Sequence, residues 1–315
     1  MNTMKRPSIV LFIFLASGST AVARDIYVSK TAGDDRFSGR TSRVLADGTG
    51  PVRSIGRALA VARPGDRIVL EKADQPYRES IALAGNRHGG DRDQPLTLVG
   101  NGAILDGSRP VPDGAWEHYE GAVFRFRPPA AAHGNLFLGG TPAVRVATET
   151  GRTKPPALEE KEWCLLGGWI YFRVEPARLP DDYDLSYAHL QTGITLHHVR
   201  WVAIVDLTVQ GFQLDGIAAV NSAREVYLTG VTARGNGRAG VSVGGACRVE
   251  FQGCLLGNNG EAQLLTLPYS ETRIEESVLL GNTAPAWVER GGDVWIDGEA
   301  VDGGRQEIGP AHEEQ

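Results

Sequence analysis

The chain has 315 residues, of which 42% are hydrophobic and 22% charged, and its formal net charge at pH 7 is −6. These values are those of an ordinary folded protein and allow one elongated domain with a small subdomain. The acidic balance disfavours nucleic acid as a partner. It also provides no general attraction to a polyanionic glycan, which would need a local basic strip or bound cations.

The start of the sequence has the features of an export signal. Residues 1–23 combine a positive start at Lys5-Arg6, an apolar run over 9–16 and a small-residue cleavage site over 21–23. This order is typical of a signal peptide and predicts a secreted or periplasmic protein. No other segment approaches the roughly eighteen apolar residues that a membrane-crossing helix needs, so we expect no membrane span.

The three cysteines, Cys164, Cys247 and Cys254, form an odd set for an exported protein. Cys247 and Cys254 flank an extended run that would hold them on the order of 20 Å apart, too far for a disulfide. No histidine or second cysteine stands at ligand spacing. We therefore expect all three to be small buried hydrophobic residues.

The sequence of residues 24–107 predicts an N-terminal cap followed by the first strands. A short helix should begin at Ser54, a good N-cap, and end before Pro64-Gly65. Its apolar face could cover the open edge of the first coil. Asp66 and Glu79 are expected to be turn and cap residues rather than catalysts. The apolar face comprises Ile55, Ala58, Leu59 and Ala62, and strands are expected over 25–28, 65–70, 96–100 and 104–107.

Residues 108–189 interrupt this pattern with two hairpins, around Gly139-Gly140 and Gly167-Gly168, which predict an inserted antiparallel β-subdomain. Its aromatic residues could stack on sugar rings, but hairpins of this size usually place them in their own core, the reading we favour. Three aspartates could hold Ca²⁺, although a solvated loop fits better because no calcium-loop spacing is present. The aromatic residues are Trp163, Trp169 and Tyr171, and the aspartates are Asp181, Asp182 and Asp184.

Residues 190–300 repeat one short unit. Asn236, Asn259 and Asn282 recur every 23 residues, because 259 − 236 = 23 and 282 − 259 = 23. Each asparagine lies between two apolar-alternating runs. A unit this short cannot bury a core alone, so it must stack as a solenoid of parallel strands about 4.8 Å apart. The asparagines would then form an internal ladder. Residues 301–315 are expected to be a polar tail.

The pattern over 226–243, Val-x-Leu-x-Gly followed by Gly-Asn-Gly and Gly-Val-x-Val, resembles the right-handed parallel β-helix repeat of the pectate-lyase-like superfamily. The resemblance implies an all-β fold, a right-handed parallel β-helix with an N-terminal capping helix and the small inserted antiparallel β-subdomain. It implies little about activity, because this fold hosts lyases, hydrolases, epimerases and adhesins.

Candidate catalytic groups should lie where successive coils bring side chains together. Before the second strand of each unit we align Thr192, Asp215, Ala239, Gln263 and Ala286, and one place earlier Leu214, Arg238, Ala262 and Pro285. Only one carboxylate appears, whereas a glycosidase normally needs two. The outward strand positions Thr195, Ala218, Ser242 and Thr266 are small and uncharged.

The segment Leu214-Asp215-Gly216-Ile217 is similar to the first aspartate motif of polygalacturonase-like hydrolases. Their Asp-Asp pair would fall at Arg238-Ala239, and their Gly-His-Gly is absent. Lyase or epimerase chemistry, which needs one base and a cation, is therefore favoured over hydrolysis. The alternative is that Asp215 is a turn residue and Arg238 its solvated partner.

The sequence thus predicts a monomeric protein that binds, and cleaves or epimerises, an extracellular polysaccharide. A non-catalytic carbohydrate-binding or surface-structural solenoid is one alternative, and a glycoside hydrolase is another. No metal site is predicted apart from the Ca²⁺ considered above. The candidate catalytic residues are Asp215, Arg238 and His197, and the candidate substrate-binding residues are Arg200 and His198.

Overall fold

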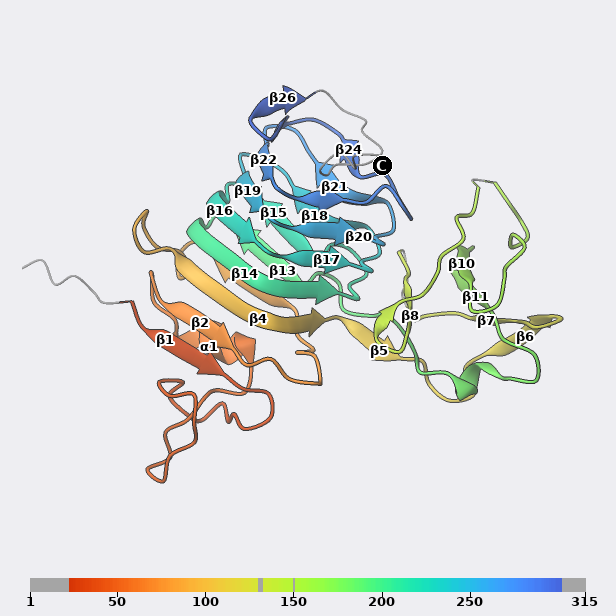
Figure 1. Ribbon diagram of the computed structural model, residues 1–315, viewed down its shortest axis with the longest axis horizontal. Helices are drawn as coiled ribbons and strands as arrows, with labels where there is room; N and C mark the ends of the chain where they lie inside the picture. Colours follow the sequence, from red (N-terminus) through yellow and green to blue (C-terminus); the bar gives the residue numbers. More distant parts are fainter. Residues whose placement is uncertain (1–22, 130–132, 150, 302–315) are drawn as a thin grey trace, which may run out of the picture.

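A computed structural model describes residues 23–129, 133–149 and 151–301 of the chain. The predicted signal peptide, except for its last residue, and the predicted polar tail, except for Val301, lie outside this part. The described chain is almost entirely β-structure with parallel sheets, which confirms the all-β prediction. Its coiled body carries a separate lobe on one side (Figure 1).

The larger sheet has twelve strands, which are parallel except for the last strand of its path, and it runs the length of the coiled body. The strands along its main path are β1 (Asp25–Val28), β2 (Arg67–Leu70), β4 (Leu96–Asp106), β14 (Arg200–Gln210), β16 (Arg224–Thr229), β19 (Arg248–Gln252), β22 (Glu271–Glu275), β25 (Asp293–Ile296) and β26 (Glu299–Val301). Beside them lie β17 (Thr232–Arg234), β20 (Leu255–Gly257) and β23 (Val278–Leu279).

The second parallel sheet, called here the six-stranded sheet, lies behind the first in Figure 1. The chain passes through both sheets once per repeat, so that each coil stacks on the one before it. The six strands are β3 (Ile81–Ala84), β13 (Ile194–His197), β15 (Ile217–Val220), β18 (Ala239–Val243), β21 (Ala262–Thr266) and β24 (Trp287–Glu289).

The core lies between the two sheets, because alternate side chains of every strand point into it. One inward column of the six-stranded sheet consists of fully buried apolar residues spaced 23 or 24 positions apart. Burial of each such side chain contributes about 1.5–3 kcal/mol before entropy is subtracted. The spacing found in the sequence is therefore the length of one coil. The column is Ile194, Ile217, Val241, Leu264 and Trp287.

The predicted asparagine ladder is present in altered form. Asn236 Nδ2 donates to Asn259 Oδ1 at 3.0 Å, and both residues are fully buried. The next link runs through Gln263, whose Oε1 accepts from Asn259 Nδ2 at 2.7 Å and whose Nε2 donates to Asn282 Oδ1 at 3.4 Å. Asn282 itself is exposed. The ladder therefore continues inside the coil through a glutamine rather than through the third asparagine.

Glycines at the start of the strands make room for this ladder. A Cβ on Gly216 would lie 2.7 Å from Asn236 Nδ2, and one on Gly240 would lie 2.7 Å from Asn259 Nδ2. The residue at the same position of the next coil is Gln263, the one that supplies the extra link. Packing against the ladder thus explains why glycine stands at these two positions.

The N-terminal segment contains the predicted helix, α1 (Ile55–Val61), with Ser54 as its N-cap accepting from the Arg57 amide. Glu79 accepts hydrogen bonds from the first two helical amides, both at 2.9 Å, and Asp66 accepts from the Arg63 amide at 2.8 Å. These contacts confirm that both acids serve turns and caps.

The lobe formed by the insert contains two antiparallel sheets. The outer sheet has the order β10-β11-β7-β6 and the inner one β5-β12-β8-β9. The predicted hairpins around Gly139-Gly140 and Gly167-Gly168 are confirmed. The strands are β5 (Ser108–Pro110), β6 (Glu117–Glu120), β7 (Val123–Phe126), β8 (Leu136–Leu138), β9 (Thr141–Pro142), β10 (Trp163–Leu166), β11 (Trp169–Arg173) and β12 (Leu185–Ala188), with a 3₁₀ turn η1 (Pro180–Asp182) before β12.

The aromatic residues of the insert mostly form its core, as predicted. Trp163 and Tyr171 are buried, whereas Trp169 is half-buried beneath the guanidinium of Arg125, 4.2 Å from its ring centre. Cys164 is buried here as well, and Cys247 and Cys254 are buried in the coil, all without disulfides. The prediction that the cysteines are small core residues is confirmed.

The C-terminal end differs from expectation in one respect. β25 stacks on β22, and the chain then turns back into the antiparallel strand β26. Asp297 and Gly298 both have positive φ, the conformation of a tight hairpin turn. Val301, assigned to the polar tail, belongs to β26. Among the described residues, no helix is long and apolar enough to cross a membrane.

Candidate functional site

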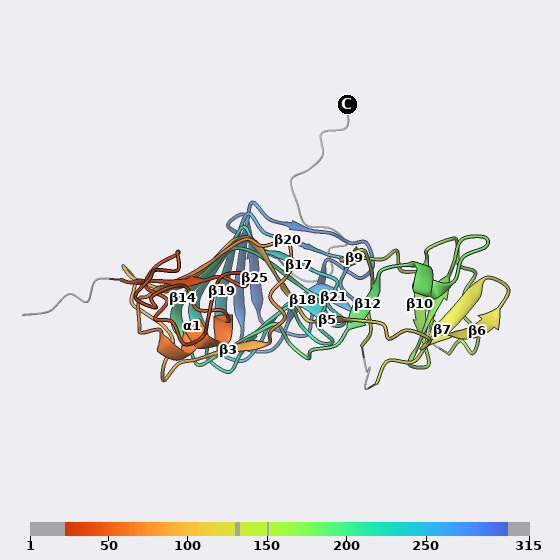
Figure 2. The same ribbon diagram turned by 90° about the horizontal axis from the view of Figure 1, so that it is seen from below.

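The insert meets the coil at one edge of the six-stranded sheet, seen from below in Figure 2. This edge, called here the junction, is built from the residues that enter β15, β18 and β21. The Arg238 amide donates to the Leu214 carbonyl, and the Glu261 amide donates to the Arg238 carbonyl. Asp215 is the next residue after Leu214. One charged side chain from each of three successive coils therefore stands at this edge.

Asp215 and Arg238 form a two-point ion pair between neighbouring coils. Arg238 Nε lies 2.8 Å from Asp215 Oδ1, and a second guanidinium nitrogen binds Oδ2. Ser242 Oγ donates to the same Oδ2 at 2.7 Å. The residue Asp215 is 1% exposed, whereas a third of the Arg238 side chain remains exposed. The carboxylate is thus sealed, and it holds a guanidinium whose outer part reaches solvent.

The charge of this guanidinium is strongly stabilised. The hydrogen bonds that Arg238 donates to Asp215 raise the pKa of Arg238, and burial opposes that rise only in part. The charge of Glu261 raises the pKa of Arg238 further, which places Glu261 within electrostatic reach of the guanidinium. Arg238 is therefore a fixed cation that can bind an anionic group at the junction.

The insert supplies the partner of Glu261. His133 Nδ1 lies 3.0 Å from Glu261 Oε1, and both side chains are partly exposed. Beside them, Arg145 Nη1 donates to the Gly260 carbonyl at 3.3 Å, and its guanidinium packs over Trp163. Burial lowers the pKa of Arg145. Two insert residues, His133 and Arg145, therefore contact the coil at the position where its charged side chains gather.

Glycines of the repeat allow this close approach. A Cβ on Gly235 would lie 2.6 Å from the Phe137 ring, and one on Gly237 would lie 2.9 Å from His133 Cβ. Gly260 likewise faces Arg145, at 3.1 Å. Glycines that read as part of the solenoid repeat therefore also form the surface on which the insert docks.

The remaining predicted residues lie at the opposite edge of the six-stranded sheet. His197 ends β13, His198 follows it with Nδ1 2.7 Å from Ser222 Oγ, and Arg200 begins β14 with its guanidinium 5.7 Å from the Trp201 ring. The register places Asp215 beside Thr192, five residues before His197, which is roughly 15 Å along an extended strand. The structure brings Asp215 and Arg238 together and keeps the two histidines and Arg200 apart from them.

The sequence alignment of the coils was wrong by one residue beyond Ala239. The structure pairs Ala239 with Ala262, so Glu261, and not Ala262, follows Arg238 in its column. Applying the 23-residue asparagine spacing to Ala239 gives 239 + 23 = 262, so the correct register was available. Thr266, assigned outward, is instead fully buried and accepts from Trp287 Nε1 at 2.9 Å. Leu265 takes its place beside Ser242.

His133 carried no signal in the sequence, because its contact with Glu261 depends on how the insert docks. Of the three candidate calcium ligands, Asp182 Oδ2 accepts from the Leu179 amide at 2.8 Å and so caps η1. Within residues 23–129, 133–149 and 151–301, no group of three or more His, Cys, Asp or Glu side chains is placed to hold a metal ion.

Comparison with known proteins reveals a similarity of fold only. No family model matches it, and no curated protein does. A solved structure described as a glycoside hydrolase is similar over 81% of this chain and 73% of its own, with 12% identity and a TM-score of 0.56. A pectate lyase, Pel9A, matches over 81% of this chain and 53% of its own, with 14% identity and a TM-score of 0.41. At these identities the first likeness supports a shared fold, and the second is too weak to add to it.

Proposed function

We propose that the chain is a secreted right-handed parallel β-helix protein that acts on an extracellular polysaccharide at the junction. In this proposal residues 24–107 and 190–300 form one solenoid, α1 covers its first coil, and residues 108–189 are an insert that walls the site. The observation that carries the proposal is the pairing of His133 from the insert with Glu261 from the coil, next to the Asp215–Arg238 pair.

The charges at the junction suit proton removal from an acidic sugar. Arg238 would bind the sugar carboxylate and stabilise the negative charge that develops when the α-proton is removed. Asp215, sealed beneath it, acts as a positioning residue rather than as the base. Glu261 holds His133 through Nδ1, which leaves Nε2 for proton transfer. The electron pair of the broken C–H bond forms a double bond as the glycosidic oxygen at the β-carbon leaves and takes a proton.

Epimerisation needs the same base and cation but returns a proton to the opposite face of the carbon. Hydrolysis is the second candidate function, because the corrected register supplies Glu261 as a second carboxylate two coils from Asp215. That pair is less suitable, since both oxygens of Asp215 are bound to Arg238 and the residue is 1% exposed. Elimination or epimerisation therefore remains the preferred chemistry.

The test is a screen of the purified protein against acidic and neutral glycans, with added calcium and with a chelator. Ultraviolet absorbance detects an unsaturated product, reducing ends detect hydrolysis, and solvent deuterium incorporation detects epimerisation. Glu261→Gln and His133→Ala should each lower turnover by about 10²-fold or more. Arg248→Gln is the matched control, because Arg248 pairs with Glu271 on the other sheet. Glycan binding without turnover would leave a non-catalytic solenoid, and the absence of both would refute the proposal.

A further inference from the structure

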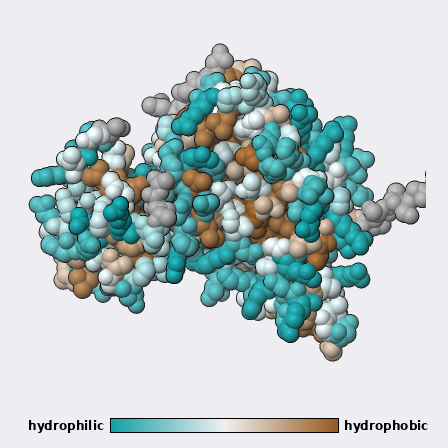
Figure 3. All heavy atoms as spheres, turned by 180° about the vertical axis from the view of Figure 1, so that it is seen from behind, coloured by the Kyte–Doolittle hydropathy of each residue, from teal (hydrophilic) through white to brown (hydrophobic). Residues whose placement is uncertain are grey.

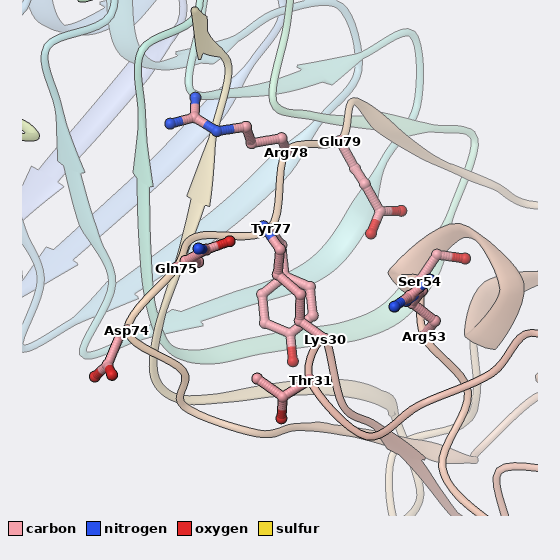
Figure 4. A pocket seen from close by; sticks show the side chains of 9 residues that line it. All are labelled: Lys30, Thr31, Arg53, Ser54, Asp74, Gln75, Tyr77, Arg78 and Glu79. Carbon is pink, nitrogen blue, oxygen red and sulfur yellow. The ribbon is translucent and has the colours of Figure 1, made fainter. Parts of the chain in front are cut away.

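A hollow lies in the N-terminal part of the coil, between the segment after β1, the start of α1 and the segment before β3. It encloses about 770 Å³ and is lined by three cations, Lys30, Arg53 and Arg78, together with Asp74, Glu79 and the edge of Tyr77. Figure 4 shows Tyr77 in the middle of these side chains, with Glu79 turned towards Ser54. The cations come from three different segments that only the fold brings together.

The acidic residue closest to the start of α1 is held by the helix rather than by a direct ion pair with these cations. Glu79 Oε1 accepts from the Ile55 amide and Oε2 accepts from the Gly56 amide, so each oxygen is already bound to the helix. Asp74 is exposed at the rim. The lining of the hollow thus carries three cations and two carboxylates, with the buried Asp106 behind Arg78, in a chain whose formal net charge is −6.

Two of the cations lie close enough to repel each other. Burial and then the charge of Arg78 lower the pKa of Lys30, against smaller opposing effects from Glu79 and Asp106. Lys30 Nζ donates to the Pro76 carbonyl, and Arg78 Nη1 donates to the Ser108 carbonyl and lies 4.0 Å from Asp106 Oδ2. Each side chain has further N–H groups for a ligand. An anion between them would relieve the repulsion and make charge-assisted hydrogen bonds.

Register connects this hollow to the junction. Ile81 pairs with Ile194, and Ile194 pairs with Ile217, so the residues two places earlier, Glu79 and Asp215, lie in one column separated by a single coil. The hollow and the junction therefore open along the same edge of the six-stranded sheet. From the coil of Glu79 to that of Glu261 there are four coil spacings, on the order of 20 Å.

We propose that the N-terminal hollow is a binding subsite for the carboxylate of an acidic sugar unit, belonging to the same glycan chain that the junction takes. It provides the local basic strip that an acidic protein needs to hold a polyanionic glycan. This assignment rests on the proposed function and narrows it to acidic polysaccharides.

The experiment measures binding of tetragalacturonate to the full chain by calorimetry, and maps it by amide chemical shifts. Lys30→Gln and Arg53→Gln should each weaken binding by about tenfold, the loss of one charge-assisted hydrogen bond. Arg57→Gln, which lies in α1 but outside the lining, should leave the affinity within about twofold. Cellotetraose, a neutral chain of equal length, and inorganic sulfate serve as ligand controls.

The outcomes separate this proposal from the function at the junction. Tetragalacturonate shifts around Lys30 and Arg78, lost in the two variants, support the subsite. Unchanged affinity in both variants, or equal shifts with sulfate or cellotetraose, overturns it. If Arg238→Gln abolishes binding while Lys30→Gln does not, the function at the junction survives without the subsite. If the hollow binds uronate but no glycan is turned over, the subsite stands and the catalytic proposal fails.

Discussion

The two partners of the ion pair at the junction should contribute unequally to the stability of the protein. Removing Arg238 should cost more than removing Asp215. Arg238→Ala removes the cation from the Asp215 carboxylate, which is 1% exposed in the intact pair, and leaves only the Ser242 hydroxyl as its partner. Removing the cation from a buried pair typically costs about 3–5 kcal/mol, because the remaining charge is buried and uncompensated. Asp215→Ala instead leaves a guanidinium that is one third exposed and can be hydrated. We expect that change to cost about 1–3 kcal/mol, including the lost partner of Ser242.

Equilibrium unfolding in urea measures both values, with the double variant completing a cycle. The double variant should be more stable than Arg238→Ala alone, since it removes the charge that the single variant leaves buried. Equal costs for the two single variants would refute the reasoning, and so would a double variant less stable than Arg238→Ala. Ser242→Ala is the control for the third hydrogen bond and should cost about 1 kcal/mol.

Two further predictions concern the core of the coil. Burial raises the pKa of Tyr77 to about 12 from 10.0, so its stabilising effect is fully present below about pH 10 and is lost as pH rises towards 12. The shift of about two units corresponds to about 2–3 kcal/mol, and the stability advantage of the native protein over Tyr77→Phe should shrink by that amount between about pH 9 and 12 in urea unfolding. A stability difference between the native protein and Tyr77→Phe that does not change with pH would contradict this prediction. Asn259→Ala should cost about 2–4 kcal/mol by leaving its buried partners unpaired, whereas the exposed Asn282→Ala should cost under about 1 kcal/mol. Similar melting temperatures for these two variants would show that the ladder does not support the coil.

Much of the fold could be predicted because each coil of a stacked repeat is under the same local constraints, so the same residue pattern recurs in the sequence. The 23-residue spacing, the apolar alternation and the N-cap at Ser54 each reflect a local constraint, and the structure contains all three. The turn of Asp297-Gly298 into β26 was missed, although Asp-Gly is a hairpin signal, because the repeat had already faded there. The route of the ladder through Gln263 depends on a side-chain contact that spacing alone does not encode.

The candidate site was less predictable because it depends both on the register between successive coils and on how the insert docks against them. A slip of one residue moves a charged side chain out of its column, and the slip at Ala262 removed Glu261 from consideration. Only the carboxylates at this edge were considered in predicting the site from the sequence. In the structure Asp215 is buried beneath Arg238, and Glu261 pairs with His133 of the insert. The proposed chemistry at this edge therefore depends on His133 from the insert. If His133→Ala leaves turnover unchanged while Glu261→Gln abolishes it, the insert only walls the site and Glu261 itself transfers the proton.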